Sequence, residues 1–312
     1  MNLLTGRSLA ALVIFFISVA IYSINLERPP HLDELYHMLA ARGLLETGEP
    51  AIGETGRYWR ALPLTWLVAQ SIDLFGDSLA AGRLPSVVMM AALVAVLFLF
   101  LHHEAGARAA WLGAGLFAVS PFAIEIAQFV RFYSVQCLLF FVAAWLVYIM
   151  LRPPWRPMRM VPLGILAAAL LAAAVYFQPT TLFGIVALAL WGAGVLALPW
   201  LVDSDVPGAR KRKIIVAIVA LALLTLVGLW LSGVLATLWQ DYRTTSLFNL
   251  PETNRFWYYH AWYVLFYPTI WTLSGVLAVF ALAKAPRVTL FLLTIFVVGF
   301  LLNSFAARKS MR

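Results

Sequence analysis

Most of the chain consists of long apolar runs that are separated by short polar segments. A helix needs about 17–25 apolar residues to cross a bilayer, and several runs reach that length. These runs lie at residues 8–25, 83–102, 107–124, 132–151, 161–178, 180–200, 214–238, 261–283 and 288–306. The pattern predicts an all-α polytopic membrane protein with about nine spans. The fifth and sixth runs are the least distinct, because only a tight QPT turn at 178–180 separates them.

Two apolar segments need a separate interpretation. Residues 61–75, ALPLTWLVAQSIDLF, are short and contain Asp73, so they suit an interfacial or re-entrant helix better than a crossing. The run at 8–25 resembles a signal peptide, but no small-x-small cleavage site follows it before the acidic stretch. We therefore predict a retained first span, with a signal peptide as the alternative.

The composition agrees with a membrane protein and narrows its partners. The chain is 63% hydrophobic and 12% charged, whereas soluble domains are about 45–50% apolar and about 25% charged. The isoelectric point near 9.8 would suit nucleic acid, but the basic residues fall in short loops between spans, where they set topology. We therefore expect membrane lipids as partners and no nucleic acid. The single cysteine, Cys137, lies in an apolar run and cannot form an intrachain disulfide.

The basic loops also predict the orientation. With a cytoplasmic N-terminus, the inner loops hold half of the 22 basic residues and three of the 14 acidic residues. The loops at 152–160 and 203–213 carry most of this excess. The segments 26–82 and 239–260 then face outward, which in a bacterial inner membrane is the periplasm.

The C-terminal end of the chain breaks this charge rule. Nine spans place the terminal cations Arg308, Lys309 and Arg312 outside. Either one span is miscounted, or these cations are held at the outer surface to bind an anion there. The chain also stops directly after a predicted helix end, so we expect it to be a C-terminally truncated piece of a longer protein.

The spans and loops together predict one transmembrane domain over residues 1–312. Its parts are a first span at 8–25, a large outer loop at 26–82 with interfacial helices, spans two to seven within 83–238, an outer aromatic loop at 239–260, and the last two spans within 261–306. The aromatic loop is dense in residue types that stack on sugars or contact lipid headgroups, although an ordinary interfacial aromatic belt is an equally valid interpretation.

The stretch HLDELYH at 31–37 carries the densest candidate chemistry. Asp33 and Glu34 are adjacent there, either as a solvated acidic helix start or as carboxylates for acid–base catalysis. His31, Asp33 and His37 have ligand-type side chains, but H-x-D-E-x-x-H matches no structural zinc signature. A metal site is therefore only a weak alternative, and His37 is interpreted as a helix-surface or acceptor-contact residue.

Several short motifs follow the acidic pair in a fixed order. They are Tyr36, Thr47–Gly48, Pro63–Leu64, Leu74–Phe75–Gly76, Arg83–Leu84–Pro85–Ser86, SPF at 120–122 and RFYS at 131–134. This ordered set resembles the GT-C fold lipid-linked-sugar glycosyltransferases of the protein-mannosyltransferase and aminoarabinose-transferase type. The resemblance covers the N-terminal 150 residues. The family's K-P-P is R-A-L-P here, from Arg60 to Pro63, and its later spans and C-terminal soluble domain are missing.

The resemblance implies an inverting glycosyltransferase. Such an enzyme moves a sugar from a polyprenyl-phosphate carrier to a hydroxyl of an envelope lipid, glycan or protein on the periplasmic side. It implies Asp33 as the general base and Glu34 as a supporting residue that orients the acceptor or raises the pKa of the base. No cofactor is certain, and a divalent metal ion is an alternative because some members of the wider fold use one.

The resemblance also implies where the substrates bind. The candidates for the donor phosphate are Arg131 with Tyr133, and secondly Arg308, Lys309 and Arg312. The candidates for further substrate contacts are Tyr36, Tyr58, Arg60 and Tyr258. For Arg131 the competing interpretation is an interfacial arginine that extends to lipid headgroups.

Two other function classes were weighed. A transporter or flippase of lipid-linked sugars is the main alternative, but transporters often carry charges near the midplane and inverted repeats. Here the charges lie at the outer ends of the spans and no inverted repeat is visible. A non-catalytic scaffold does not explain the acids and aromatics gathered in the first outer loop. A hexose, a uronic acid and an amino-pentose all remain compatible with the residues.

Overall fold

A computed structural model describes residues 6–152, 157–202 and 258–305. The predicted span 214–238, nearly all of the aromatic loop 239–260 and the cations Arg308, Lys309 and Arg312 lie outside these residues. The chain forms two compact units, Met1–Met150 with Trp155–Leu182, and Leu151–Pro154 with Phe183–Arg312. Within the described ranges every regular element except one short hairpin is a helix, which confirms the predicted all-α class.

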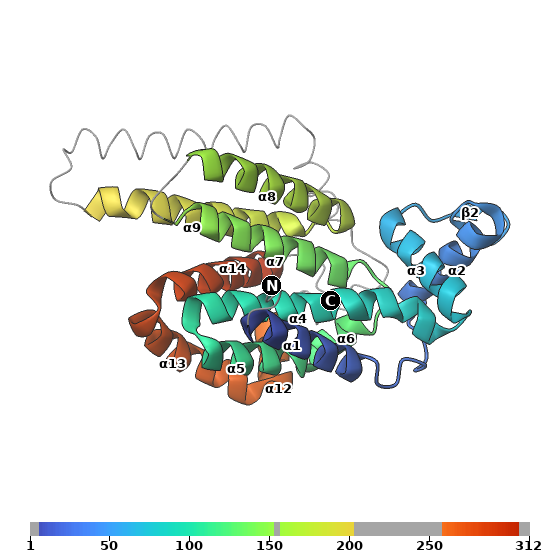
Figure 1. Ribbon diagram of the computed structural model, residues 1–312, viewed down its shortest axis with the longest axis horizontal. Coiled ribbons are helices and arrows are strands. Elements are labelled where there is room, and N and C mark those ends of the chain that lie inside the picture. Colours follow the sequence, from blue (N-terminus) through green and yellow to red (C-terminus); the bar gives the residue numbers. More distant parts are fainter. Residues whose placement is uncertain (1–5, 153–156, 203–257, 306–312) are drawn as a thin grey trace. The chain divides into compact units, whose positions relative to one another are not determined.

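The first unit contains the predicted outer loop and the early spans (Figure 1). Its elements are α1 (Gly6–Tyr22), α2 (Leu32–Thr47), β1 (Ala51–Ile52), β2 (Gly56–Arg57), α3 (Leu62–Phe75), α4 (Leu79–Ala105), α5 (Ala107–Ala118), α6 (Pro121–Ala127), α7 (Tyr133–Met150) and α8 (Pro157–Phe177). Helix α4 is central, because α1, α3, α5, α6 and α7 all contact it.

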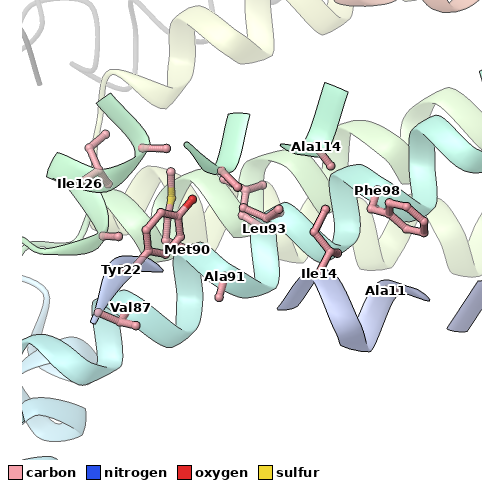
Figure 2. Packing of buried hydrophobic residues seen from close by; sticks show 14 of the residues in the cluster. Ala11, Ile14, Tyr22, Val87, Met90, Ala91, Leu93, Phe98, Ala114 and Ile126 are labelled. Carbon is pink, nitrogen blue, oxygen red and sulfur yellow. The ribbon is translucent and has the colours of Figure 1, made fainter. Parts of the chain in front are cut away.

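The membrane core of this unit is built around α4. Buried residues of α1, α4, α5 and α6 form one apolar cluster, in which α1 contributes Ile14 and Tyr22 and α4 contributes Met90 and Phe98 (Figure 2). Helix α5 presents alanines to this cluster, at 110, 114 and 118. Small residues at this spacing let helices approach closely in a membrane, where dispersion contacts drive association.

A second buried cluster joins α2 and α3 to the turn before α7. Met38 of α2 and Leu64 and Val68 of α3 are buried together with Val130 and Phe132, which precede α7. Helix α3 has 14 residues and is about 21 Å long, which is shorter than the ~30 Å hydrocarbon layer. Its length therefore agrees with the predicted interfacial helix.

Helix α2 has well-defined ends. Its first turn is a capping box, in which the His31 ring accepts from the Asp33 N–H at 3.2 Å and the Glu34 carboxylate accepts from the His31 N–H at 3.0 Å. Its C-cap is Gly48, whose φ of 76° lies in the left-handed region that favours glycine. The T-G pair noted in the sequence thus ends this helix.

The α2–α3 connection contains a small antiparallel hairpin that sequence analysis did not predict. β1 and β2 have two residues each, with Ala51 opposite Arg57 and Ile52 opposite Gly56. Strands this short carry no alternation pattern from which they could be predicted. The hairpin packs closely on α2, because a Cβ on Gly43 would lie 2.6 Å from the backbone nitrogen of Ala51.

Two predicted spans are bent, which corrects the expectation of continuous helices. The run predicted at 107–124 is the pair α5 and α6, bent by 62°, and the run at 261–283 is the pair α12 and α13, bent by 106°. The breaks fall before Pro121 and Pro268. Proline lacks the backbone N–H that a helix needs and clashes with the preceding turn, so it starts a new helix at each position.

The number of crossings stays a prediction. In the described part of the chain, four helices are long and apolar enough to cross, or six if each bent pair is one span. They are Leu79–Ala105, Tyr133–Met150, Met160–Phe177 and Pro286–Ser304. At the predicted first and sixth spans the structure has apolar helices, Gly6–Tyr22 and a segment Thr181–Ala197, which are shorter than 18 residues and are not among the four.

The second unit contains most of α9 (Thr181–Val202), α12 (Tyr258–Phe266), α13 (Pro268–Lys284) and α14 (Pro286–Phe305). Aromatic side chains hold the bend between α12 and α13. Tyr263 stacks on Trp271 at 4.7 Å, and the Trp271 indole donates to His260 at 3.1 Å. Phe296 and Phe300 of α14 pack on the same two rings.

The close approach at Gly43 gives the first prediction. Gly43→Ala should lower the free energy of unfolding by more than about 1 kcal/mol, because the new methyl group meets rigid backbone atoms. The matched control is Gly115→Ala on α5, where a Cβ meets nothing within 4 Å and stability should be unchanged or higher. Thermal unfolding of the purified variants in detergent measures both. Equal stabilities would contradict the close packing at Gly43.

Candidate active site

Charged and aromatic side chains gather where three segments of the first unit meet. These are the start of α2, the 58–61 stretch before α3, and the 128–132 turn before α7. Asp33 and His37 come from α2, Tyr58 and Arg60 from the second segment, and Arg131 from the third. The structure thus brings together residues that lie up to about a hundred positions apart in the chain.

Glu34 lies beneath this group and is almost completely buried. Its carboxylate receives Arg83 Nη2 at 2.6 Å and Arg83 Nε at 3.2 Å. It also accepts the backbone N–H groups of Val130 and His31, both at 3.0 Å. A carboxylate offers about four acceptor positions, and these four bonds fill them. These contacts indicate a positioning role for Glu34, and its expected effect on the acceptor or on the pKa of Asp33 stays a prediction.

Arg83 completes this network, and sequence analysis did not identify it as a site residue. Its side chain is 1% exposed, and its Nη1 also donates to the carbonyls of Leu26 and Arg28, the latter at 2.9 Å. Gln128 adds bonds to the carbonyls of the same α1–α2 connection, at 22 and 24. The sequence did contain a signal for this role. Arg83 lies at the start of an apolar run, and a buried arginine there requires a partner of opposite charge.

Asp33 faces the opposite way and meets Arg131. Its Oδ2 lies 3.3 Å from Arg131 Nη2, and its side chain is 35% exposed against 11% for the arginine. Glu34 positions both residues of this contact. It follows Asp33 directly in the chain, and it accepts the backbone N–H of Val130, which precedes Arg131. The expected base and the expected phosphate ligand are therefore adjacent.

Two guanidinium groups share one aromatic ring in the site. Arg60 lies 4.5 Å and Arg131 lies 5.0 Å from the centre of the Phe132 ring. Arg60 Nη2 also donates to the neutral side chain of Gln178 at 3.0 Å, and Arg131 Nη1 donates to the Tyr58 hydroxyl at 3.4 Å. With Asp33 as the carboxylate facing them, this group carries a net positive charge that suits an anion.

Tyr36 and Tyr58 form an aromatic wall beside these cations. Their rings stack at 5.6 Å with 20° between the planes, and Tyr36 is 40% exposed. Burial raises the pKa of the Tyr58 hydroxyl, so this group stays protonated at neutral pH. Stacked, partly exposed tyrosines offer a flat surface to a sugar ring or an acceptor.

His37 is buried, which corrects its assignment to the helix surface. Its Nδ1 lies 2.9 Å from the Thr65 hydroxyl, and its ring meets Tyr58 at 4.9 Å and 87°. Burial lowers its pKa to about 3, with the nearby charges of Arg131 and Arg60 acting in the same direction. The imidazole is therefore neutral at physiological pH.

The structure does not group His31, Asp33 and His37 as a metal site. His31 Nδ1 accepts the Asp33 backbone N–H, while His37 Nδ1 is engaged by Thr65. Across the residues that the structure describes, no three His, Cys, Asp or Glu side chains are grouped so that they could hold a metal ion.

Of the remaining candidates, Tyr133 borders this contact group, Tyr258 lies in the second unit, and the C-terminal cations fall outside the described residues. Tyr133 opens α7 and stacks on Phe129 at 6.3 Å, with the Arg131 guanidinium 5.9 Å from its ring. Tyr258 is the first residue of α12 in the second unit, where it packs against Tyr259. Arg308, Lys309 and Arg312 fall beyond the last described residue.

One comparison with known proteins identifies the fold. A crystal structure of apo ArnT from Cupriavidus metallidurans matches this chain with a TM-score of 0.59 and 15% sequence identity. The match covers 97% of this chain and 55% of the ArnT chain, so this chain spans about half the length of that protein. The chain therefore has the GT-C fold of that aminoarabinose transferase, which confirms the resemblance found in the sequence motifs. No protein-family model and no curated protein matches the chain.

The Glu34–Arg83 network gives the second prediction. Glu34→Gln should lower the free energy of unfolding by about 3–5 kcal/mol, because it leaves the buried Arg83 charge without a counter-charge. Asp77→Asn is the matched control. It removes one charge of the exposed Arg42–Asp77 pair and should cost no more than about 1 kcal/mol.

Unfolding followed by heat or denaturant in detergent compares these two variants. The network would not be the main stabilising element of the site if both variants unfolded at the same midpoint.

Proposed function

We propose that this chain acts as an inverting glycosyltransferase of the inner membrane. It would take a sugar from a polyprenyl-phosphate carrier and attach it to a hydroxyl of an envelope lipid, glycan or protein on the periplasmic side. The single observation that carries this proposal is the contact between Asp33 and Arg131, one carboxylate and one guanidinium at the surface of a GT-C fold.

Asp33 supplies the base that the reaction needs. The acceptor hydroxyl must lose its proton as its oxygen attacks the anomeric carbon, so a carboxylate within hydrogen-bond reach is required. Asp33 is partly exposed, and its neighbour Glu34 is fully engaged in the interior. The proton moves to the Asp33 carboxylate as the new bond forms from the face opposite the phosphate, which inverts the anomeric centre.

Arg131 and Arg60 supply the cations for the leaving group. When the bond between the anomeric carbon and the phosphate oxygen breaks, its electron pair stays on that oxygen, and the carrier becomes a phosphate monoester with an additional negative charge. A leaving group of this kind needs charge stabilisation and no proton. Two guanidiniums on the Phe132 ring provide planar donors suited to phosphate oxygens.

The contact with Arg131 also orients the sugar between base and cation. The carboxylate and the phosphate meet the same guanidinium, so the anomeric carbon attached to the phosphate lies close to the acceptor oxygen that Asp33 deprotonates. The stacked Tyr36 and Tyr58 line the approach to this point and would contact the sugar or the acceptor. Fixing reactants in this way removes much of the entropic barrier of a two-substrate reaction.

The role of Asp33 gives the third prediction. Asp33→Asn should abolish sugar transfer, because the amide cannot take the acceptor proton, while the protein still inserts and folds. Asp77→Asn removes another exposed carboxylate of the same outer segment and should retain wild-type transfer.

A deletion strain complemented with each variant provides the measurement, with mass spectrometry of the envelope glycans. Full modification of the envelope by the Asp33→Asn strain would remove Asp33 as the base. Movement of lipid-linked sugar across proteoliposomes without any glycosylated product would instead support a transporter.

The role of Arg131 gives the fourth prediction. Arg131→Ala should weaken binding of undecaprenyl phosphate by about 10- to 100-fold, because a charge-assisted hydrogen bond to the phosphate is lost. Arg42→Gln is the control, because Arg42 pairs with Asp77 on the exposed side of the outer segment. Titration of the purified protein in nanodiscs measures the dissociation constants. Equal affinity in the wild type and Arg131→Ala would place the phosphate elsewhere.

A further inference from the structure

His37 carries a feature that the proposed reaction does not use. The residue is fully buried, and its Nε2 has no hydrogen-bond partner among the described residues. A buried polar atom without a partner is costly, so its surroundings should compensate in another way. Its neighbours are the rings of Tyr58 and Phe132, which both contact the guanidiniums of the site.

One tautomer of His37 would give both ring nitrogens a partner. A neutral imidazole has one N–H, and the Thr65 hydroxyl can donate or accept. If Nδ1 accepts from Thr65, the N–H is on Nε2 and can point at the negative face of an aromatic ring. The Tyr58 ring centre lies 4.9 Å from the imidazole centre, and the two planes make an angle of 87°, a T-shaped arrangement with which such a contact is compatible.

Tyr58 connects this buried group to the surface. Its ring is held between Tyr36, which stacks on it, and His37, which meets it edge-to-face. Its hydroxyl accepts a hydrogen bond from Arg131 Nη1 at 3.4 Å. A continuous set of contacts therefore runs from Thr65 through His37 and Tyr58 to the guanidinium.

We propose that His37 is a positioning residue that sets the orientation of the Arg131 guanidinium through Tyr58. The Thr65 hydroxyl fixes the imidazole, the imidazole N–H fixes the Tyr58 ring, and the Tyr58 hydroxyl fixes Arg131. His37 does not exchange protons during the reaction. This inference rests on the proposed role of Arg131 in phosphate binding.

A positioning role and a packing role of His37 predict different donor binding when a side chain is replaced by one of similar shape. His37→Phe keeps an aromatic ring of similar size but loses the bond to Thr65 and the N–H. Thr65→Val keeps the shape of Thr65 and removes its hydroxyl. A packing role predicts that both variants bind the donor normally wherever they are folded, whereas a positioning role predicts weaker binding.

The fifth prediction is measured as binding of undecaprenyl phosphate to the full chain in nanodiscs, below the unfolding temperature of every variant. His37→Phe, Thr65→Val and Tyr58→Phe should each weaken binding by about three- to tenfold, the range for one lost hydrogen bond. In the Tyr58→Phe background, His37→Phe should add less than twofold, because both act through the same hydroxyl. The pH profile of sugar transfer should keep its shape in His37→Phe, since His37 stays neutral.

The outcomes separate this inference from the proposed function. Normal binding by His37→Phe and Thr65→Val, together with loss of binding by Arg131→Ala, would overturn the positioning role alone. A full effect of His37→Phe in the Tyr58→Phe background would overturn it as well. Normal binding by Arg131→Ala would overturn the proposed phosphate site itself. If His37→Phe does not fold, Thr65→Val carries the test.

Discussion

A buried ion pair between Glu34 and Arg83 sets the arrangement of the segments around the start of α2 in the first unit. Removing two charges from water costs several kcal/mol per ion, so such a pair persists only where further hydrogen bonds satisfy both groups. Here Glu34 also binds the backbone at His31 and Val130, and Arg83 also binds the carbonyls of Leu26 and Arg28. One network therefore fixes the α1–α2 connection, the start of α2 and the turn before α7 against the N-terminal end of α4.

The two adjacent carboxylates take opposite roles because of helix geometry. Successive side chains on a helix point about 100° apart, so an inward Glu34 leaves Asp33 facing outward. Buried Glu34 thereby holds exposed Asp33 next to Arg131. Glu34 also accepts the backbone N–H of Val130, the residue before Arg131. Rigid support of this kind is what a reaction needs when its groups act mainly by position and charge. The buried contact between His37 and Thr65 would support Arg131 in the same way, through Tyr58.

The sequence predicted the helical class and the GT-C fold, because hydropathy and ordered motifs report on these directly. It did not predict that Arg83 pairs with Glu34, because 49 residues separate them and no local pattern encodes their contact. It did not predict that His37 is buried, because α2 exposes Leu32 and Leu39 and buries Glu34 and His37, the reverse of an ordinary amphipathic helix. The bends at Pro121 and Pro268 were hidden by apolar runs that continue across them.

The decisive experiment is a structure of the full chain in nanodiscs with undecaprenyl phosphate bound. We expect a phosphate oxygen about 3 Å from the Arg131 guanidinium, the Asp33 carboxylate facing the same space, and Glu34 still bound to Arg83. A phosphate bound away from Arg131, or a Glu34 that leaves Arg83 to contact the ligand, would contradict this expectation.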